Sequence, residues 1–323
     1  MNIFSKLAHA GLIEAHALLA VMRHGIPDAI LQFGGGIGDE LLLTTVAHEL
    51  KRRDPSMKIW QVSHSTELLR YNPDYTKTFT WNDWYLRYTF LLQSKRKNLA
   101  YAVERIPQKE EVPPSEHILV VLCRNAGMSG SVALRPYLSL TDEEKNNGSL
   151  GDFQITVQCL GAESFRTVML NKLWSAEKFQ LVVDGLHAVY GGGAQIVQVG
   201  GAADPILRGV TDLRGKTTLR ESAALIHRSR FFIGTVGLGM HLARAVDCRS
   251  VIIYGGREHS SQSGYSCNEN IDSFVDCAPC WKWNDCDYDR KCMTMISVDQ
   301  VMNAVQRLLR RADKPLETDT AKL

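Results

Sequence analysis

The second half of the chain alternates short apolar segments with amphipathic ones, and this alternation restricts the fold more than any other feature. Strand character is found over 154–160, 195–199, 231–234 and 250–254. Helical spacing of apolar residues is found between them, over 176–190, 218–228 and 240–246, and again over 298–309. Strands that alternate with helices predict an α/β protein with a parallel, doubly wound sheet. Ligands of such sheets bind at the carboxyl ends of the strands, where this chain has Gly200, Gly201, Gly234, Gly255 and Gly256.

The first half contains fewer such segments. Residues 29–33, 58–62 and 118–122 have strand character, and a helix is predicted over 1–22. The 323 residues exceed what one hydrophobic core of about 250–300 residues usually holds, so we expect two domains. The polar segment Leu140 to Gly151 is interpreted as the linker. The predicted domains are therefore 1–150 and 151–323.

A glycine-rich turn follows the first predicted strand. Gly35, Gly36 and Gly38 lead into Asp39, and helical spacing of apolar residues begins directly afterwards. Such a turn lets the backbone approach a ligand closely and directs helix N–H groups toward it. It is not a dinucleotide fingerprint, because Asp39 stands where the last glycine would be required. Asp39 is either a proton acceptor or the N-cap of the helix, and the sequence alone leaves both open.

Charge and hydropathy exclude two classes of partner. The 37 basic and 35 acidic residues leave a net charge of +2, which argues against nucleic acid as the main partner. No stretch approaches the roughly 20 apolar residues of a membrane span. Residues 1–22 lack the pattern of a signal peptide, so we expect a cytoplasmic protein whose first helix packs on the core. The alternative is a helix that contacts the inner membrane peripherally.

The eight cysteines are unevenly placed. Three lie in apolar, strand-like contexts and are predicted to be buried in the core: Cys123, Cys159 and Cys248. Four others fall within 16 residues: Cys277, Cys280, Cys286 and Cys292. Thiolates at this spacing can hold a structural zinc or iron ion, reduced thiols and disulfides being the alternatives. Cys267 is expected to lie outside this cluster.

Four segments, in order, resemble the ADP-heptose:lipopolysaccharide heptosyltransferases of glycosyltransferase family 9. They are Gly36-Ile37-Gly38-Asp39, Lys172-Leu173-Trp174, the region 199–221 and the region 232–255. The resemblance implies the GT-B fold, in which two Rossmann-like domains face a central cleft. It also implies an inverting glycosyltransferase that takes a sugar from a nucleotide-diphosphate sugar similar to ADP-heptose. The acceptor would be a hydroxyl of the lipopolysaccharide core or of another glycan, bound by the first domain.

The resemblance further implies roles for single residues. Asp39 would be the catalytic base, Lys172 would hold the leaving diphosphate, Thr167 would contact phosphate and Asp204 the ribose. The other implied donor-binding residues are Thr217, Thr218, Glu221, Gly234, Gly239 and His241. No metal is expected at the reaction centre.

Each of these residues also has a purely structural interpretation. Lys172 can be an exposed lysine ahead of a helix, and Asp204 a surface loop residue. Thr217 or Thr218 can cap a helix that begins at Leu219, with Glu221 completing a capping box. His241 can be a buried histidine whose ring nitrogens are satisfied within the protein.

One departure from the family pattern concerns the donor site. The family usually has an acid–Ser/Thr–Gly triplet where this chain has Val236-Gly237-Leu238. The loss leaves the donor sugar open and allows two alternatives to a lipopolysaccharide enzyme. One is a protein-modifying, autotransporter-type heptosyltransferase with a metal-binding Cys finger, which can form homo-oligomers. The other is a relative that binds nucleotide sugars without catalysing transfer.

Overall fold

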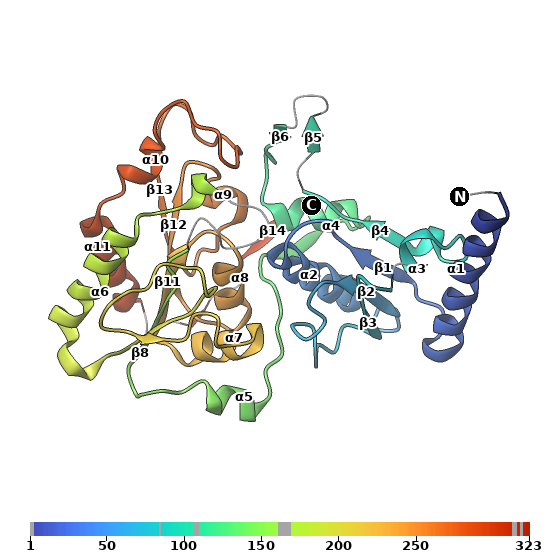
Figure 1. Cartoon of the computed structure of the whole chain (residues 1–323), viewed down its shortest axis with the longest axis horizontal. Coiled ribbons are helices and arrows are strands. Elements are labelled where there is room, and N and C mark those ends of the chain that lie inside the picture. The colour runs from blue at the N-terminus through green and yellow to red at the C-terminus, as the bar shows by residue number, and fades with distance from the viewer. Residues whose placement is uncertain are drawn as a thin grey trace.

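The structure is a computed structural model of two lobes placed side by side, which the chain connects more than once (Figure 1). It describes residues 3–83, 85–101, 103–105, 110–160, 169–311, 315–316 and 319–323. Side chains are described for the same residues except 3–9, 103–105 and 110–111. Thr167, predicted to contact phosphate, lies outside the described residues.

The first lobe is built on a parallel sheet. Its strands lie in the order β3 (Lys77–Thr80), β2 (Ile59–Ser63), β1 (Ala29–Gln32) and β4 (Arg96–Asn98). Ala29 pairs with Ile59, and Ile30 pairs with Arg96 on the other side. All four β1 residues are buried, as the apolar run over 29–33 predicts for a central parallel strand. The helices of this lobe are α1 (Ile3–His24), α2 (Ile37–Arg53), α3 (Tyr85–Tyr88) and α4 (Ile118–Asn125).

The second lobe holds a parallel sheet of six strands. Their order is β10 (Thr211–Asp212), β9 (Gln195–Gln198), β8 (Gln154–Val157), β11 (Phe231–Thr235), β12 (Ser250–Gly255) and β13 (Glu269–Asp272). The helices are α6 (Ala176–Tyr190), α7 (Leu219–Arg228), α8 (Leu238–Ala245), α9 (Ser260–Ser263), α10 (Lys291–Thr294) and α11 (Val298–Arg310). α6 and α11 cover one face of the sheet, and α7 and α8 cover the face toward the first lobe (Figure 1). The predicted parallel α/β sheet is confirmed.

Two segments differ from the prediction. Residues 118–122 form helix α4 rather than a strand. His117 caps this helix by accepting the Leu119 N–H, and the apolar side chains are buried nearly all round the helix. A short apolar run does not distinguish a buried strand from a buried helix, and Cys123 therefore lies in a helix. The predicted linker contains α5 (Asp142–Asn147), which Thr141 and Glu144 cap with a capping box.

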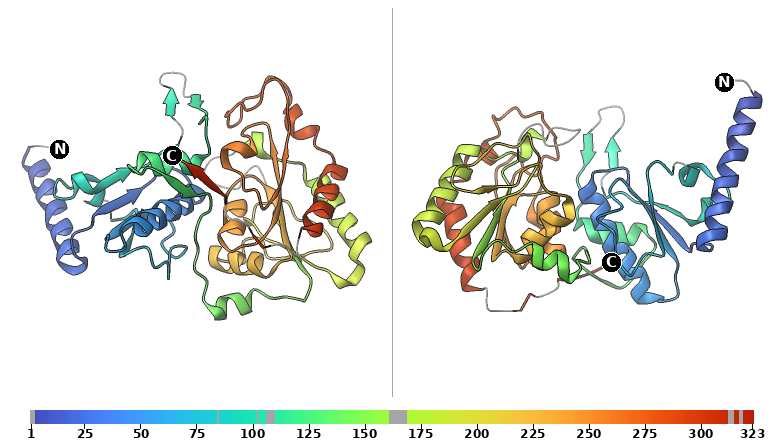
Figure 2. Two further views of the ribbon diagram at one scale, coloured as in Figure 1. Left: turned by 180° about the vertical axis from the view of Figure 1, so that it is seen from behind. Right: turned by 60° about the horizontal axis from the view of Figure 1, so that its bottom comes forward.

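The two lobes share one hydrophobic core. α2 of the first lobe packs on α8 of the second, and a Cβ added to Gly38 would lie only 3.5 Å from Cα of Leu238. The last strand, β14 (Thr320–Lys322), pairs antiparallel with β7 (Ser131–Ala133) of the first lobe. The chain end thus returns to the first lobe, which Figure 2 shows from two further directions. A hairpin of β5 (Val103–Arg105) and β6 (Glu110–Val112) projects beside the junction (Figure 1).

Several features predicted from the sequence are present in the structure. α6 has the predicted bounds, and Thr218 and Glu221 form the predicted capping box at the start of α7. Cys123, Cys159 and Cys248 are buried. Among the described residues, no helix is both long enough and apolar enough to cross a bilayer.

Candidate functional site

Asp39 lies in the first turn of α2, at the face of the first lobe that meets the second. Its Oδ2 accepts the Gly36 N–H at 2.7 Å, and its Oδ1 accepts the Tyr101 hydroxyl at 2.6 Å. Gly36, not Asp39, is therefore the N-cap, and Asp39 stabilises the turn from the third helical position. Gly35 is required beside it, because a Cβ there would lie 2.2 Å from Asp39 Oδ2. Asp39 thus takes part in capping α2 through the Gly36 N–H, and the Tyr101 hydroxyl fixes the orientation of its carboxylate.

Burial raises the pKa of the Asp39 carboxyl above its usual range. The hydrogen bonds from Tyr101 and Gly36 and the charge of Lys172 counteract this pKa rise in part. A lysine of the second lobe is therefore close enough to act on Asp39 electrostatically. A raised pKa makes a carboxylate a stronger base, while hydrogen-bond donors keep it oriented.

Lys172 belongs to the second lobe, in a single 3₁₀ turn over Leu170–Lys172. Its Nζ lies 2.6 Å from Oε1 of Glu258, and only 15% of its side chain is exposed. The interpretation of Lys172 as an exposed surface lysine is therefore wrong. Glu258 follows β12 and its glycines Gly255-Gly256, at the carboxyl end of a central strand.

Glu258 is the centre of a buried charge cluster that the sequence prediction missed. Burial alone would raise the pKa of Glu258, but the charges of Lys172 and Arg257 lower that pKa to about 2. The Ser263 hydroxyl also donates to its Oε2 at 2.8 Å. The signal for this residue was present, because Arg257-Glu258 directly follow a strand end that the fold places at the cleft.

Tyr101 and Trp281 connect the two sides of the site. The Tyr101 ring lies 6.2 Å from the Trp281 ring, and the Arg257 guanidinium lies 4.9 Å from the same indole. Trp281 is buried and its Nε1 donates to Gln262 at 3.1 Å. Trp281 sits within the Cys-rich segment, so this segment forms a wall beside Asp39. Nothing in the local sequence identified Tyr101.

Helices α2 and α8 both begin directly after a glycine, and their first turns are in contact at the junction of the lobes. α8 begins after Gly237, whose φ of 151° favours glycine, and Leu238 packs on Gly38 at the start of α2. The N-terminal ends of α2 and α8 therefore approach the cleft from different lobes, and such ends attract anions. Gly239 is required there as well, because a Cβ would lie 2.3 Å from Oε1 of Gln158. The triplet Val236-Gly237-Leu238 serves the contact between lobes instead of supplying an acid.

His241 lies in α8 and is buried. Its Nδ1 is 2.7 Å from the Tyr265 hydroxyl, and burial lowers the pKa of His241 to about 3. The ring is therefore neutral at physiological pH. This is the satisfied buried histidine of the alternative interpretation, yet the charges of Glu258 and Lys172 act on it, so it lies near the cluster.

The remaining predicted donor residues, after β9, at the start of α7 and in β11, are held by local contacts. Asp204 is buried rather than on the surface, and its Oδ2 accepts the Gly201 N–H at 2.9 Å. Thr217 hydrogen-bonds to Ser222 at 2.8 Å, while Thr218 and Glu221 cap α7. Gly234 lies within buried strand β11, where a Cβ would meet the Phe232 ring at 2.7 Å. None of these contacts requires a ligand.

A cavity of about 340 Å³ opens in the first lobe beside the glycine turn. It is lined by Gln32, Gly34, Trp81, Arg87, Tyr88, Asn98 and Leu99. Glu40, the neighbour of Asp39, fixes the Trp81 ring by accepting its Nε1 at 2.8 Å. His64 stacks on Trp81 with ring centroids 4.7 Å apart, and Arg87 lies 4.3 Å from its ring. The buried Oε1 of Gln32 has no hydrogen-bond partner among the described residues. The lining of this cavity therefore combines aromatic rings with a few polar groups, as small-molecule sites do.

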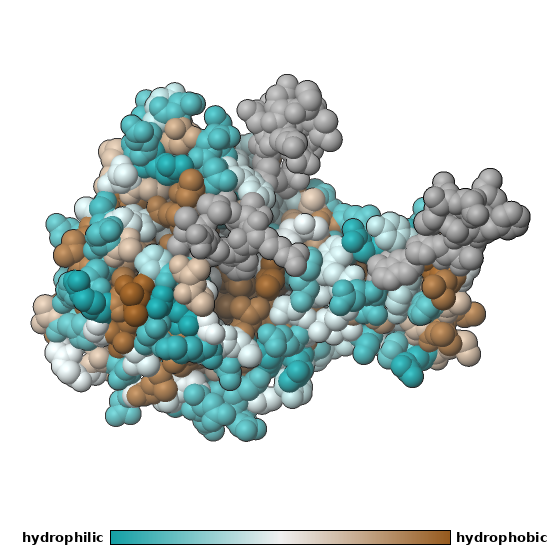
Figure 3. Space-filling view, viewed as in Figure 1, coloured by the Kyte–Doolittle hydropathy of each residue, from teal (hydrophilic) through white to brown (hydrophobic). Residues whose placement is uncertain are grey.

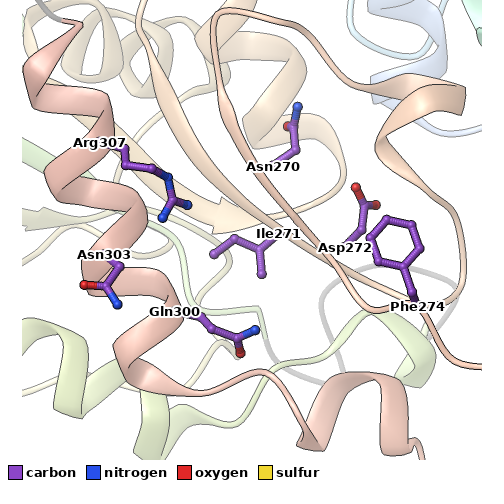
Figure 4. Close-up of a pocket in the computed structure, with 7 residues that line it drawn as sticks. All are labelled: Asn270, Ile271, Asp272, Phe274, Gln300, Asn303 and Arg307. Carbon is purple, nitrogen blue, oxygen red and sulfur yellow. The ribbon is translucent and has the colours of Figure 1, made fainter.

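A second cavity of about 320 Å³ lies at the edge of the other sheet. Figure 4 shows Gln300, Asn303 and Arg307 of α11 opposite residues of β13 and the exposed ring of Phe274. It contains none of the predicted site residues.

The four clustered cysteines are free thiols in the structure. The neighbouring sulfurs of Cys280, Cys277 and Cys286 add to the burial that raises the pKa of Cys292. Among the described residues, however, no three His, Cys, Asp or Glu side chains are arranged to hold a metal ion. The predicted metal therefore stays a prediction, supported by the proximity of the thiols alone.

Comparison with known proteins agrees with this architecture. Residues 136–286, a little under half of the chain, match the model of the family described as "Glycosyltransferase family 9 (heptosyltransferase)". Lipopolysaccharide heptosyltransferase 3 of Escherichia coli K12 is 29% identical over 158 residues, which cover 43% of either chain. A second Escherichia coli heptosyltransferase 3 is 29% identical over 128 residues, covering 36% of this chain and 35% of the relative. The chain thus aligns with less than half the length of these relatives.

Solved structures show the same fold over most of the chain. The iron-containing dodecameric glycosyltransferase TibC from enterotoxigenic Escherichia coli superimposes with a TM-score of 0.68 at 16% identity, covering 88% of this chain and 76% of that one. Escherichia coli ADP-heptose lipopolysaccharide heptosyltransferase II gives 0.63 at 14% identity, covering 88% and 99%. The predicted GT-B fold and the resemblance to glycosyltransferase family 9 are confirmed.

Proposed function

We propose that the protein is an inverting glycosyltransferase that transfers a heptose from a nucleotide-diphosphate sugar to an acceptor hydroxyl. The observation that carries this proposal is the pairing across the junction of the lobes. Asp39, oriented by Tyr101, lies close enough to the Lys172–Glu258 pair of the second lobe for both charges to act on it. The matches to family 9 and to heptosyltransferases supply the reaction class and the sugar.

In the proposed reaction the acceptor oxygen attacks the anomeric carbon as the bond from that carbon to the diphosphate oxygen breaks. Asp39 takes the hydroxyl proton, and a single displacement inverts the anomeric centre. Lys172 and the helix ends at Ile37 and Leu238 stabilise the negative charge on the leaving diphosphate. Glu258 holds Lys172 in place before the donor binds and provides the cleft with a carboxylate, which Val236-Gly237-Leu238 does not.

The acceptor is proposed to bind in the cavity lined by Gln32, Trp81 and Arg87. This cavity borders the glycine turn that leads to Asp39. Both faces of Trp81 are occupied, by His64 and by Arg87, so the indole serves as a rigid wall. The exposed Arg87 guanidinium is the charged group of this lining that would bind the acceptor. The acceptor hydroxyl belongs either to a glycan of the lipopolysaccharide core or to a protein.

Asp39→Asn tests the proposal. With ADP-heptose as donor and a heptose-deficient lipopolysaccharide core as acceptor, we expect transfer to fall by about 10²–10⁴-fold, the usual contribution of a general base. Donor binding, measured by calorimetry, should persist. Asp142→Asn, at an exposed aspartate, is the matched control. Transfer by Asp39→Asn at the wild-type rate would exclude Asp39 as the base. Failure of the wild type to bind any nucleotide sugar would reject the enzyme itself.

A further inference from the structure

Arg220 is a buried arginine that connects three parts of the chain. It is the second residue of α7, in the second lobe, and only 4% of it is exposed. Its Nε and Nη2 donate to the two carboxylate oxygens of Glu144, in α5 of the linker, both at 2.6 Å. Nη2 also donates to the Ser139 carbonyl at 2.7 Å, and Nη1 donates to the carbonyls of Glu67 and Arg70 at 3.3 and 3.2 Å. Glu67 and Arg70 belong to the first lobe, between β2 and β3.

All five N–H groups of the Arg220 guanidinium therefore have an acceptor within the protein. Arg220 has no donor left for a phosphate or a sugar, although it lies in the region 199–221 that resembles a donor-binding region. A planar guanidinium that is satisfied on every side fixes the direction of its partners as well as their distance. Arg220 thus holds α7, the linker and the first lobe relative to one another.

This contact depends on charge and hydrogen bonds. None of the α5 residues is buried, and Figure 3 shows hydrophilic residues over this helix, at the lower edge of the view. The hydrogen bond from Arg220 is the main cause that lowers the pKa of Glu144 to about 2, so the pair is charged at neutral pH. The Tyr71 ring lies 5.3 Å from the same guanidinium, and the φ of Tyr71 is 64°. A residue other than glycine keeps this conformation only where its surroundings fix it.

Arg220 lies apart from the candidate site, on the linker side of the junction. At the site, Leu238 of α8 packs on Gly38, next to Asp39. α7 packs on α8 and has Arg220 in its first turn, and Figure 1 shows α5 and α7 below α8. The lobes therefore meet at separate points, of which Gly38–Leu238 is one and Arg220 another. A second point restricts the rotation of one lobe about the other that a single point would permit.

We propose that Arg220 is a positioning residue for the transfer reaction, because it keeps the lobes in the arrangement that places Asp39 close to the Lys172–Glu258 pair. This inference rests on the proposed function, and it assigns no chemical step to Arg220. Without Arg220 the lobes remain connected by the linker and by β14, but they sample other arrangements. Transfer then falls with the fraction of molecules in the competent arrangement, whereas a donor held by the second lobe still binds.

Arg220→Met and Arg220→Lys in the full chain test this proposal. With ADP-heptose and a heptose-deficient lipopolysaccharide core, Arg220→Met should lower kcat about tenfold, the order of one lost charged hydrogen bond, and leave the donor KM within about twofold. Small-angle X-ray scattering without substrates should give it a larger radius of gyration than the wild type. Arg220→Lys keeps the charge but not the five donors, so it should restore part of kcat. Arg228→Met, at an exposed arginine that ends the same helix, is the matched control and should behave like the wild type.

Two outcomes would overturn the positioning role. One is a wild-type kcat in Arg220→Met. The other is an unchanged radius of gyration together with a lower kcat and melting temperature, which would leave Arg220 a residue of fold stability alone. If Arg220→Met does not fold, Glu144→Gln breaks the same pair from the linker and should show the same two effects to a smaller degree. A wild type that transfers nothing rejects the proposed function, whereas a radius of gyration that every variant leaves unchanged rejects the positioning role by itself.

Discussion

Each lobe contributes one carboxylate near the junction, and the charge of Glu258 acts on Asp39, but the surroundings of the two carboxylates differ. Asp39, in the first lobe, is held by two neutral donors, and burial raises its pKa. Glu258, in the second lobe, is held by two cations, and its pKa is lowered to about 2. Environments that drive the pKa values of neighbouring acids apart assign them different roles. In the proposed reaction this contrast suits Asp39 to accept the proton and Glu258 to remain the charged partner of Lys172.

The same contrast explains why neither residue replaces the other. A general base must exchange a proton during turnover, and neutral hydrogen-bond donors permit this. A carboxylate between two cations does not take up a proton near neutral pH, so it can only orient and neutralise. The next two predictions, on Lys172 and on the pH dependence of transfer, test this division of roles.

Lys172→Met should have the largest effect, because it removes a cation that acts on both Asp39 and Glu258. Glu258 would lose its closest partner while remaining buried, which costs about 3–5 kcal/mol of unfolding free energy for a broken buried pair. The burial of Glu258 would then raise its pKa. The destabilisation should therefore be largest at neutral pH and should shrink as pH falls and Glu258 becomes protonated. Urea unfolding at a series of pH values measures this.

Lys216→Met is the control for this experiment. Lys216 also lies near an acid, with Nζ 3.5 Å from Asp212, but its side chain is 60% exposed. Exposed pairs contribute about 0–1 kcal/mol, so the change should be small. Equal destabilisation by the two variants would show that the burial of the Lys172–Glu258 pair has no energetic consequence.

Two substitutions should shift the pH dependence of transfer in opposite directions, because they change the pKa of Asp39 in opposite directions. The Tyr101 hydrogen bond lowers the pKa of Asp39, and the charge of Glu258 raises it. Tyr101→Phe should therefore move the acid limb of the kcat/KM profile to higher pH, and Glu258→Gln should move it to lower pH. At neutral pH we expect Tyr101→Phe to reduce kcat/KM by about tenfold, the order of one charged hydrogen bond. If the acid limbs of the two variants shifted in the same direction, Asp39 would not be the base.

The sequence predicted the second lobe better than the first. In the second lobe the four inner strands, β8, β9, β11 and β12, are short apolar runs separated by helices of 3.6-residue periodicity, so their type and order followed directly. The edge strands β10 and β13 are polar and were not predicted. In the first lobe the apolar run at Ile118 was compatible with either element, and only its burial between α2 and its neighbours decides for a helix. Local pattern cannot supply that information.

The site was predictable in part for the same reason. Asp39 and Lys172 carry motifs, and the strand-end rule leads to the position of Glu258. Tyr101 and Trp281 have no motif, and their position depends on how the lobes pack. The capping box at Thr218 shows the opposite case, because a residue implied by the family has a complete structural explanation.

Loss of a metal should have the smallest effect on transfer, because the cysteine segment reaches Asp39 indirectly: its Trp281 ring lies 6.2 Å from the ring of Tyr101, which donates to Asp39. We predict one zinc or iron ion per chain, measured by mass spectrometry on protein purified without chelator. Cys280→Ser should lower that content and the melting temperature, since structural metals stabilise the fold that binds them. Transfer should fall only several-fold, through displacement of Trp281. Cys159→Ala, a buried thiol outside the cluster, should retain the metal. A wild type that contains no metal and melts normally would leave the four thiols as reduced packing residues.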